Sequence, residues 1–200
     1  MWDNFVQASV QWQQLQAPLA ERHPLLALID VDGKDEASLR ESVEAALGDA
    51  MEAGEVADAV IAQSQTQAKS LWKLREAPAE LNTQMHPPVN FDVSLPQAEI
   101  GRFAAAIQAA FDARWPGHHT LFFGHVGDGN LHVSTDGATV GGACEAVEAE
   151  LYRVVGAFHG SVSAEHGIGL HKKPFLALSR TPQELAAMRA IKAALDPLGL

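Results

Sequence analysis

A glycine-rich turn between two short apolar runs is the feature that most constrains the fold of this 200-residue chain. Gly127-Asp128-Gly129-Asn130 separates the run 120–123 from the run 131–134. Glycine, aspartate and asparagine together favour a tight turn, and the runs on either side are typical of strands. The sequence therefore predicts a β-hairpin here, which brings antiparallel pairing into the sheet.

Hydrophobic periodicity predicts the remaining elements. Short apolar or alternating runs predict three further strands, at 24–32, 56–62 and 89–95. Helical spacing predicts helices at 35–54, 65–85, 96–115, 142–158 and 181–195. Pro78 is expected to kink the second of these helices or to end it early, and Thr181 with Glu184 forms a capping-box pattern. Residues 1–23 favour a helix or a connector.

The order of these elements leaves two fold classes open. Alternating strands and helices would suit a parallel, doubly wound sheet. The hairpin, and the lack of a glycine-rich loop directly after the first predicted strand, favour an α+β sandwich instead. We expect one antiparallel sheet with helices packed on one face, folded as one compact unit.

Composition excludes several classes of protein. Lys and Arg number 14 against 25 Asp and Glu, a net charge of −11, which disfavours a nucleic-acid-binding surface. The single cysteine, Cys144, excludes a disulfide framework and a CxxC motif. No apolar run approaches the roughly 20 residues that cross a bilayer, and the N-terminus lacks the features of a signal peptide. We therefore expect a cytoplasmic chain without a transmembrane segment.

Two segments rich in glycine and histidine carry the chemistry. They are Gly124–His132 (GHVGDGNLH) and Ser163–Gly169 (SAEHGIG). His125 ends one strand of the hairpin and His132 begins the other, so their imidazoles can face each other, and Glu165 can add a carboxylate. Two imidazoles and one carboxylate form a common metal-ligand set that leaves positions open for substrate, and such a set suits Zn²⁺, Mn²⁺ or Fe²⁺.

Other polar residues have competing interpretations. His166 follows Glu165 and can act as a general base, because an imidazole titrates near neutrality. Arg75 either pairs at the surface or binds a substrate carboxylate with both guanidinium nitrogens. His171 beside Lys172 favours a surface turn. The remaining histidines are expected to be solvated: His23, His86, His118, His119 and His159.

The two glycine–histidine segments, as a pair and in this order, resemble the C-terminal cap domain of FAD-linked oxidases. That family contains D-lactate, glycolate and D-2-hydroxyglutarate dehydrogenases. Three more segments fit the same family: Trp72–Arg75, Asp92–Pro96 and Ile191–Pro197. The resemblance implies a ferredoxin-like α+β cap over residues 24–200, after a connector at 1–23. It also implies that the cap covers the flavin of a separate FAD-binding domain, absent from this chain and supplied upstream or as a second chain. The face that meets that domain could form a homodimer in isolation.

The resemblance also assigns roles to single residues. It implies that His125, His132 and Glu165 bind a divalent ion, usually zinc. His166 would be the catalytic base, and Arg75 would hold the substrate carboxylate.

The same resemblance indicates the reaction, in which a flavoprotein oxidises a D-2-hydroxy acid to a 2-oxo acid by hydride transfer to FAD. Relatives that handle a second carboxylate carry lysine where this chain has Asn90 and asparagine where it has Ser134. We therefore expect Asn90 and Ser134 to contact a substrate of the lactate or glycolate type. The electron acceptor could place the enzyme peripherally at a membrane. Taken alone, the residues also leave open a self-sufficient 2-His-1-carboxylate metalloenzyme, either a hydrolase or a non-haem iron oxygenase, and a non-catalytic binding module.

Overall fold

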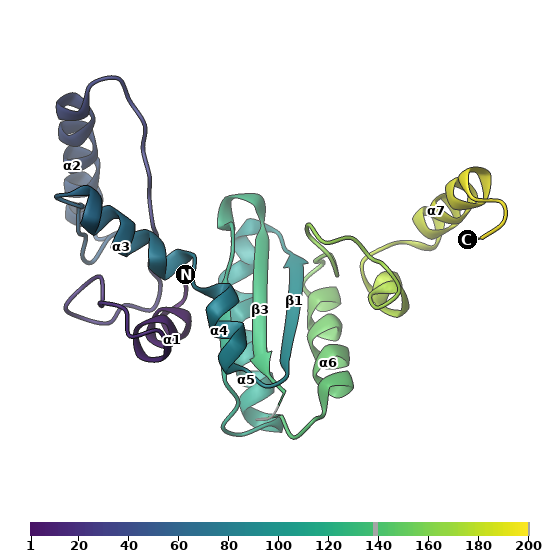
Figure 1. Ribbon diagram of the computed structural model, residues 1–200. Coiled ribbons are helices and arrows are strands. Elements are labelled where there is room, and N and C mark those ends of the chain that lie inside the picture. Colours follow the sequence, from purple (N-terminus) through teal and green to yellow (C-terminus); the bar gives the residue numbers. More distant parts are fainter. Residues whose placement is uncertain (138–139, 200) are drawn as a thin grey trace. The chain divides into compact units, whose positions relative to one another are not determined.

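The computed structural model describes residues 1–137 and 140–199 (Figure 1). Its internal contacts divide the chain into two units, Met1–Gln84 and Met85–Leu200, where the sequence favours a single one. The division falls between a short helix and the first strand of the sheet, a position without the glycine- or serine-rich composition of a typical linker. The assignment of 24–200 to a substrate and metal cap stays a prediction.

The first unit is helical. Its helices are α1 (Asp3–Trp12), α2 (Glu36–Glu52), α3 (Gln65–Arg75) and α4 (Pro78–Gln84). The Asp35 carboxylate accepts a hydrogen bond from the Ser38 N–H at the start of α2, and Ser64 caps α3 in the same way through the Gln67 N–H. The predicted helix 65–85 is thus two helices, and Pro78 begins the second, as the fixed φ and missing N–H of proline favour.

The two strands predicted in this unit are wrong. Within 24–32 only Leu25 makes a bridge, to Trp2, and 56–62 contains no strand. Ile29 and Val60 are exposed, and no neighbouring strand among the described residues takes up the backbone N–H and C=O groups of either run. A short apolar run predicts burial only when a partner is available, and a sequence pattern does not supply that partner.

The second unit is built on a three-stranded antiparallel sheet in the order β1-β3-β2. Its strands are β1 (Pro88–Ser94), β2 (Thr120–Phe123) and β3 (Asn130–Asp136), and the hairpin of β2 and β3 is as predicted. Helix α5 (Ile100–Arg114), after the 3₁₀ turn η1 (Gln97–Glu99), connects β1 to β2, while β3 inserts between them. This is the split β-α-β arrangement of ferredoxin-like folds, so the predicted α+β class is confirmed.

The segment that follows α6 (Cys144–Ala157) lies along the free edge of β1. Ser94 and Ser161 form a bridge in which each backbone N–H donates to the other residue's carbonyl, at 3.1 and 2.8 Å. In a ferredoxin-like sheet this is the place of the fourth strand. Here it is shortened to one bridge, after which the chain is free to turn toward the polar face of the sheet.

Strand pairing gives the sheet one apolar and one mixed face. Phe91 of β1, Val133 of β3 and Phe122 of β2 are register partners and buried, so they lie on one face. Tyr152 of α6 packs edge-on against Phe91, with ring centroids 5.7 Å apart, and places α6 on this side. The opposite face carries Asn90, Asp92, His132 and Ser134.

One histidine predicted to be solvated is buried. The side chain of His118 is 1% exposed, and its ring nitrogens lie 2.6 Å from Thr120 Oγ1 and 3.0 Å from Asp112 Oδ1. These contacts join the last turn of α5 to the start of β2. The sequence does not distinguish this structural role from solvation, because only the fold directs Asp112 and Thr120 at the His118 ring.

The chain continues through two shorter elements and a last helix. These are η2 (Val126–Asp128) in the hairpin turn, η3 (Lys173–Leu178) and α7 (Pro182–Leu195). The predicted capping box is confirmed: Thr181 Oγ1 accepts from the Glu184 N–H, and the Glu184 carboxylate accepts from the Thr181 N–H at 2.7 Å. Among the described residues, no helix is both long and apolar enough to cross a membrane.

Candidate metal centre

His132 and Asp92 form the core of a polar cluster on the sheet. They are register partners on β3 and β1, and His132 Nδ1 lies 3.7 Å from Asp92 Oδ1. Asp92 is buried, whereas 17% of the His132 side chain is exposed. The sheet therefore presents one imidazole at the protein surface with a buried carboxylate behind it.

The glycine-rich segment Ser163–Gly169 is held to this pair through its backbone. Asp92 Oδ2 accepts hydrogen bonds from the N–H groups of Ala164, Glu165 and His166, at 3.1, 2.9 and 2.9 Å. Three donors directed at one oxygen form a nest for a negative charge. The bridge at Ser161 brings the chain to the edge of β1. The hydrogen bonds to the Asp92 carboxylate then hold the following residues over the polar face of the sheet.

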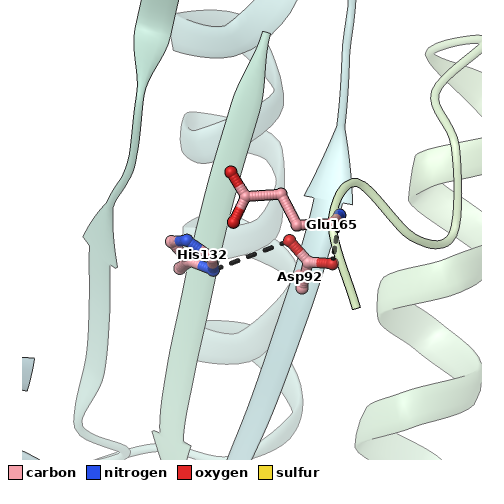
Figure 2. Close-up of side chains that lie close together, drawn as sticks. All are labelled: Asp92, His132 and Glu165. Carbon is pink, nitrogen blue, oxygen red and sulfur yellow. Dashed lines mark hydrogen bonds and ion pairs between the residues drawn. The ribbon is translucent and has the colours of Figure 1, made fainter. Parts of the chain in front are cut away.

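This path of the chain brings Glu165 close to His132. Ligand atoms of Asp92, His132 and Glu165 all lie within 4.8 Å of one another, and Figure 2 shows the two carboxylates and the imidazole gathered over β1 and β3. His125, two residues beyond β2 and directly before η2, has its Nδ1 3.8 Å from Glu165 Oε1. Of the predicted ligands, His132 and Glu165 therefore lie together, although they come from two distant segments, whereas His125 is near Glu165 and Asp92 takes its place in the group within 4.8 Å.

His166, the predicted base, lies at the rim of the cluster. Its ring is stacked on that of His132, with centroids 6.0 Å apart and planes inclined by 29°. Its Nδ1 is 3.9 Å from Asp92 Oδ2, and 65% of its side chain is exposed. An imidazole in this position can exchange a proton with solvent and with a molecule bound beside His132.

The electrostatics favour metal-ligating protonation states. Burial lowers the pKa of His132 below its usual 6.5, and the neighbouring His166 and His125 add to this, against the opposing effect of Asp92 and Glu165. Burial alone would raise the pKa of Asp92. The N–H donors of His166 and Glu165, together with the Lys172 ammonium, outweigh that effect and hold it below its usual value. A neutral imidazole and an ionised carboxylate are the forms that bind metal.

Two residues of this cluster escape prediction from the sequence. Asp92 enters only as part of a strand end. His171 is exposed in a turn as predicted, but the side chain of Lys172 beside it is 13% exposed and points inward to Asp92. Lys172 Nζ donates to the Asp92 carbonyl and to Ser163 Oγ, both at 3.0 Å, and lies 3.7 Å from Asp92 Oδ2. The available signal for Asp92 is a charged residue in the middle of an alternating strand, where a buried charge needs a partner.

The donor set fits a divalent cation. Asp92 Oδ1 is buried and accepts no hydrogen bond from the described residues, although it faces His132. A buried carboxylate oxygen in this state is costly unless a cation or a polar group is nearby. Imidazole nitrogen and carboxylate oxygen are the ligands that Zn²⁺ and related ions accept.

The predicted substrate residues divide between the two units. Asn90 and Ser134 are register partners on the same face as the cluster, and Ser134 Oγ donates to Asn90 Oδ1 at 2.6 Å. They form a neutral, hydrogen-bonded pair two residues along each strand from Asp92 and His132. Arg75 is half-buried at the end of α3 in the first unit, and its contact with a substrate carboxylate stays a prediction.

Fold and site together define a class of protein: an α+β domain in which a histidine and an aspartate on the polar face of an antiparallel sheet meet a glutamate from a glycine-rich loop. The model of the family described as FAD linked oxidases, C-terminal domain, matches residues 1–200, and the chain belongs to this family.

Curated relatives agree with this assignment. The chain is 42% identical over 188 residues to a D-2-hydroxyglutarate dehydrogenase of Xanthomonas citri pv. viticola, covering 91% of this chain and 39% of the relative. It is 36% identical over 193 residues to the enzyme of the same name from Stutzerimonas stutzeri, covering 92% and 40%. A candidate mitochondrial D-lactate dehydrogenase of Schizosaccharomyces pombe is 31% identical over 211 residues, covering 100% and 40%. The chain thus spans about two fifths of these relatives, from 39% to 40% of their length.

Proposed function

We propose that this chain is the substrate- and metal-binding part of a flavin-dependent dehydrogenase that oxidises a D-2-hydroxy acid to a 2-oxo acid. The observation that carries the proposal is the convergence of His132 and Glu165 with Asp92 within 4.8 Å, and of His125 with Glu165 at 3.8 Å. Membership of the FAD-linked oxidase family supports FAD as the electron acceptor. In this proposal FAD is held outside the chain, by a binding domain joined upstream or supplied separately.

His125, His132 and Glu165 would hold the divalent ion, which we propose to be zinc. When bound, the ion would supply Lewis acidity, lowering the pKa of a substrate hydroxyl that reaches it. His166, stacked on His132 at the exposed rim, takes the hydroxyl proton, while the hydrogen on C2 leaves with its electron pair. Arg75 binds the substrate carboxylate through its guanidinium group. One proton and one hydride leave the hydroxy acid, which balances its conversion to the oxo acid.

The substrate tail is proposed to lie near Asn90 and Ser134. This pair is neutral and internally hydrogen-bonded, which suits a short uncharged tail of the lactate or glycolate type. Two of the relatives, in contrast, are named for D-2-hydroxyglutarate, which carries a second carboxylate. Competition between D-lactate, glycolate and D-2-hydroxyglutarate decides between these classes. A preference for the dicarboxylate would contradict the assignment of Asn90 and Ser134.

The metal is tested on the chain itself. We expect about one zinc ion per chain after purification without chelator and dialysis, measured by elemental analysis. His132→Ala is expected to lose that zinc, whereas His171→Ala, which removes an exposed histidine outside the cluster, is expected to keep it. An absence of stoichiometric zinc in the unmodified chain, or an equal loss in both variants, contradicts the proposed site.

The redox activity is tested in a chimera. This chain replaces the matching segment of the Xanthomonas citri relative, and oxidation of hydroxy acids is followed with an artificial electron acceptor. We expect turnover that requires bound FAD and is lost with His166→Gln. Ferrous-dependent oxygen uptake by this chain alone, without flavin, would favour the self-sufficient iron oxygenase instead.

The proposal keeps the protein in the cytoplasm or peripherally at a membrane, whereas the Arabidopsis thaliana relative is named as mitochondrial.

A further inference from the structure

We infer that Asp92 is a positioning residue, which assembles the candidate centre by holding the backbone of residues 164–166 so that Glu165 and His166 face His132. The inference rests on the proposed function for its consequence, since the residues positioned are the proposed ligand and base. It adds a residue that is neither the base nor one of the three metal ligands named in that proposal. The work of Asp92 is to fix where the neighbouring segment lies.

The two oxygens of the Asp92 carboxylate have separate partners. Oδ2 accepts the N–H groups of Ala164, Glu165 and His166, all within 3.1 Å. Oδ1 points the other way and lies 3.7 Å from His132 Nδ1. One buried side chain therefore touches both halves of the centre, the loop on one side and the sheet imidazole on the other.

Nothing else among the described contacts holds this loop as directly. Residues 164–166 have no regular structure, and Glu165 and His166 are exposed through their side chains. The edge bridge ends at Ser161, three residues before the first N–H donor to Oδ2. Without the carboxylate, the N–H groups of Glu165 and His166 would lose their acceptor, and the loop would be tied to β1 through the Asp92 carbonyl, which accepts from the Ala164 N–H at 3.3 Å and from Lys172 Nζ at 3.0 Å.

Lys172 completes the arrangement from the far end of the loop. Its ammonium donates to the Asp92 carbonyl and to Ser163 Oγ at 3.0 Å each, and Ser163 Oγ in turn lies 2.9 Å from the Gly167 carbonyl. A buried carboxylate is tolerated when it is paired and hydrogen-bonded, and Lys172 supplies the opposite charge. Lys172 thereby places a positive charge beside Asp92 and closes the loop over it.

Backbone hydrogen exchange tests the inference on the full chain. The amides of Glu165 and His166 are expected to exchange slowly in the unmodified protein without metal, because Asp92 Oδ2 is their acceptor. In Asp92→Asn we expect this protection to fall, and zinc affinity, measured by competition with a fluorescent chelator, to fall about 10- to 100-fold, as for loss of a group that orients metal ligands. Asp128→Asn removes a nearby exposed carboxylate and is the matched control for charge, and it is expected to leave both measurements unchanged.

The outcomes separate this inference from the proposed function. If the Glu165 and His166 amides exchange in the unmodified chain as fast as in an unstructured peptide, the inference is overturned, whether or not Asp92→Asn folds. It is also overturned if Asp92→Asn folds and retains their protection, or lowers zinc affinity no more than Asp128→Asn does. If the unmodified chain binds no zinc, the proposed function fails, and the exchange measurement alone then decides the role of Asp92.

Discussion

Asp92 of β1 and His132 of β3 are register partners, and their facing Oδ1 and Nδ1 atoms lie 3.7 Å apart on the polar face of the sheet. Neighbouring residues 91 and 93 point into the core on the opposite face, so the pleat that buries Phe91 and Val93 also fixes the direction of Asp92. A slip of one residue in this register would bury His132 and expose the core. The centre and the core are therefore positioned by the same pairing.

Zinc affinity is expected to fall as the pH is lowered from 8 to 5. Protons compete with the metal for His132, so the apparent affinity should fall by up to about tenfold per pH unit where this imidazole becomes protonated. Because burial lowers the pKa of His132 below 6.5, protons are expected to displace zinc from this residue only toward the acidic end of the range. Chelator competition across this range measures the effect, and an affinity that stays flat would contradict histidine ligation.

Gly160→Ala is expected to weaken both the second unit and its zinc site. A Cβ at this buried glycine would lie 2.7 Å from the Ser94 carbonyl oxygen and 2.8 Å from Leu95 Cδ2, so the segment would have to move away from the edge of β1. We expect a loss of about 1–3 kcal/mol in the free energy of unfolding, the range for overpacking, measured by urea denaturation of the metal-free chain. Zinc affinity should fall together with the free energy of unfolding, because residues 164–166 come after the segment that Gly160 holds at the edge of β1.

Gly101→Ala is the control for this substitution. A Cβ at Gly101 in α5 meets no atom within 4 Å, and alanine is the better helix former. We expect unchanged zinc affinity and equal or higher stability. If Gly160→Ala behaves like Gly101→Ala, close approach of the chain to β1 does not position the site.

The sequence predicts the strands of the second unit well because their pattern and their partners coincide. The alternation through 89–95 and the turn at 127–130 each specify a strand whose neighbour lies nearby in the hairpin or the split β-α-β unit. The runs 24–32 and 56–62 are as apolar but have no such partner. His125, His132 and Glu165 can be proposed as ligands from the sequence because each lies in a motif, and their metal binding stays a prediction. Asp92 and Lys172 are not, since their role depends on the β1–β3 register and on a loop that folds back over it.

Acid titration of stability is expected to separate two glutamates of α6. Glu150 bonds Arg153 at 2.7 Å and lies 3.3 Å from Arg114 of α5, and these partners, Arg153 above all, hold its pKa below the usual 4.5. A group whose pKa is lowered in the folded state stabilises the fold at pH values above its usual pKa. This stabilisation is lost as the pH falls through the folded-state pKa. Glu150→Gln should therefore cost up to about 1 kcal/mol at pH 7 and progressively less below pH 4.5.

Glu148 provides the opposite sign on the same helix. Burial raises its pKa above 4.5, so its charge disfavours the folded state at neutral pH. Glu148→Gln is expected to leave stability at pH 7 unchanged or higher. Urea denaturation at pH 7 and pH 4 measures both variants. Equal losses for the two substitutions at pH 7 would show that the loss of any α6 carboxylate, rather than the arginine pairs, is what matters.

Thr181→Ala is expected to loosen α7 without unfolding the sheet. No residue of this helix is buried, so its stability depends on its caps more than on packing. Loss of the Thr181 cap costs about 1 kcal/mol, which should raise amide exchange rates in α7 about fivefold if the helix opens locally. Thr181→Ser keeps the hydroxyl and should restore protection, and Gln183→Ala, on the same first turn but outside the capping box, should leave exchange unchanged. Zinc affinity and the unfolding of the sheet should not respond to any of the three variants, because α7 supplies no residue to either. A fall in the unfolding temperature of the sheet with Thr181→Ala would instead mean that α7 is packed as part of the same cooperative unit.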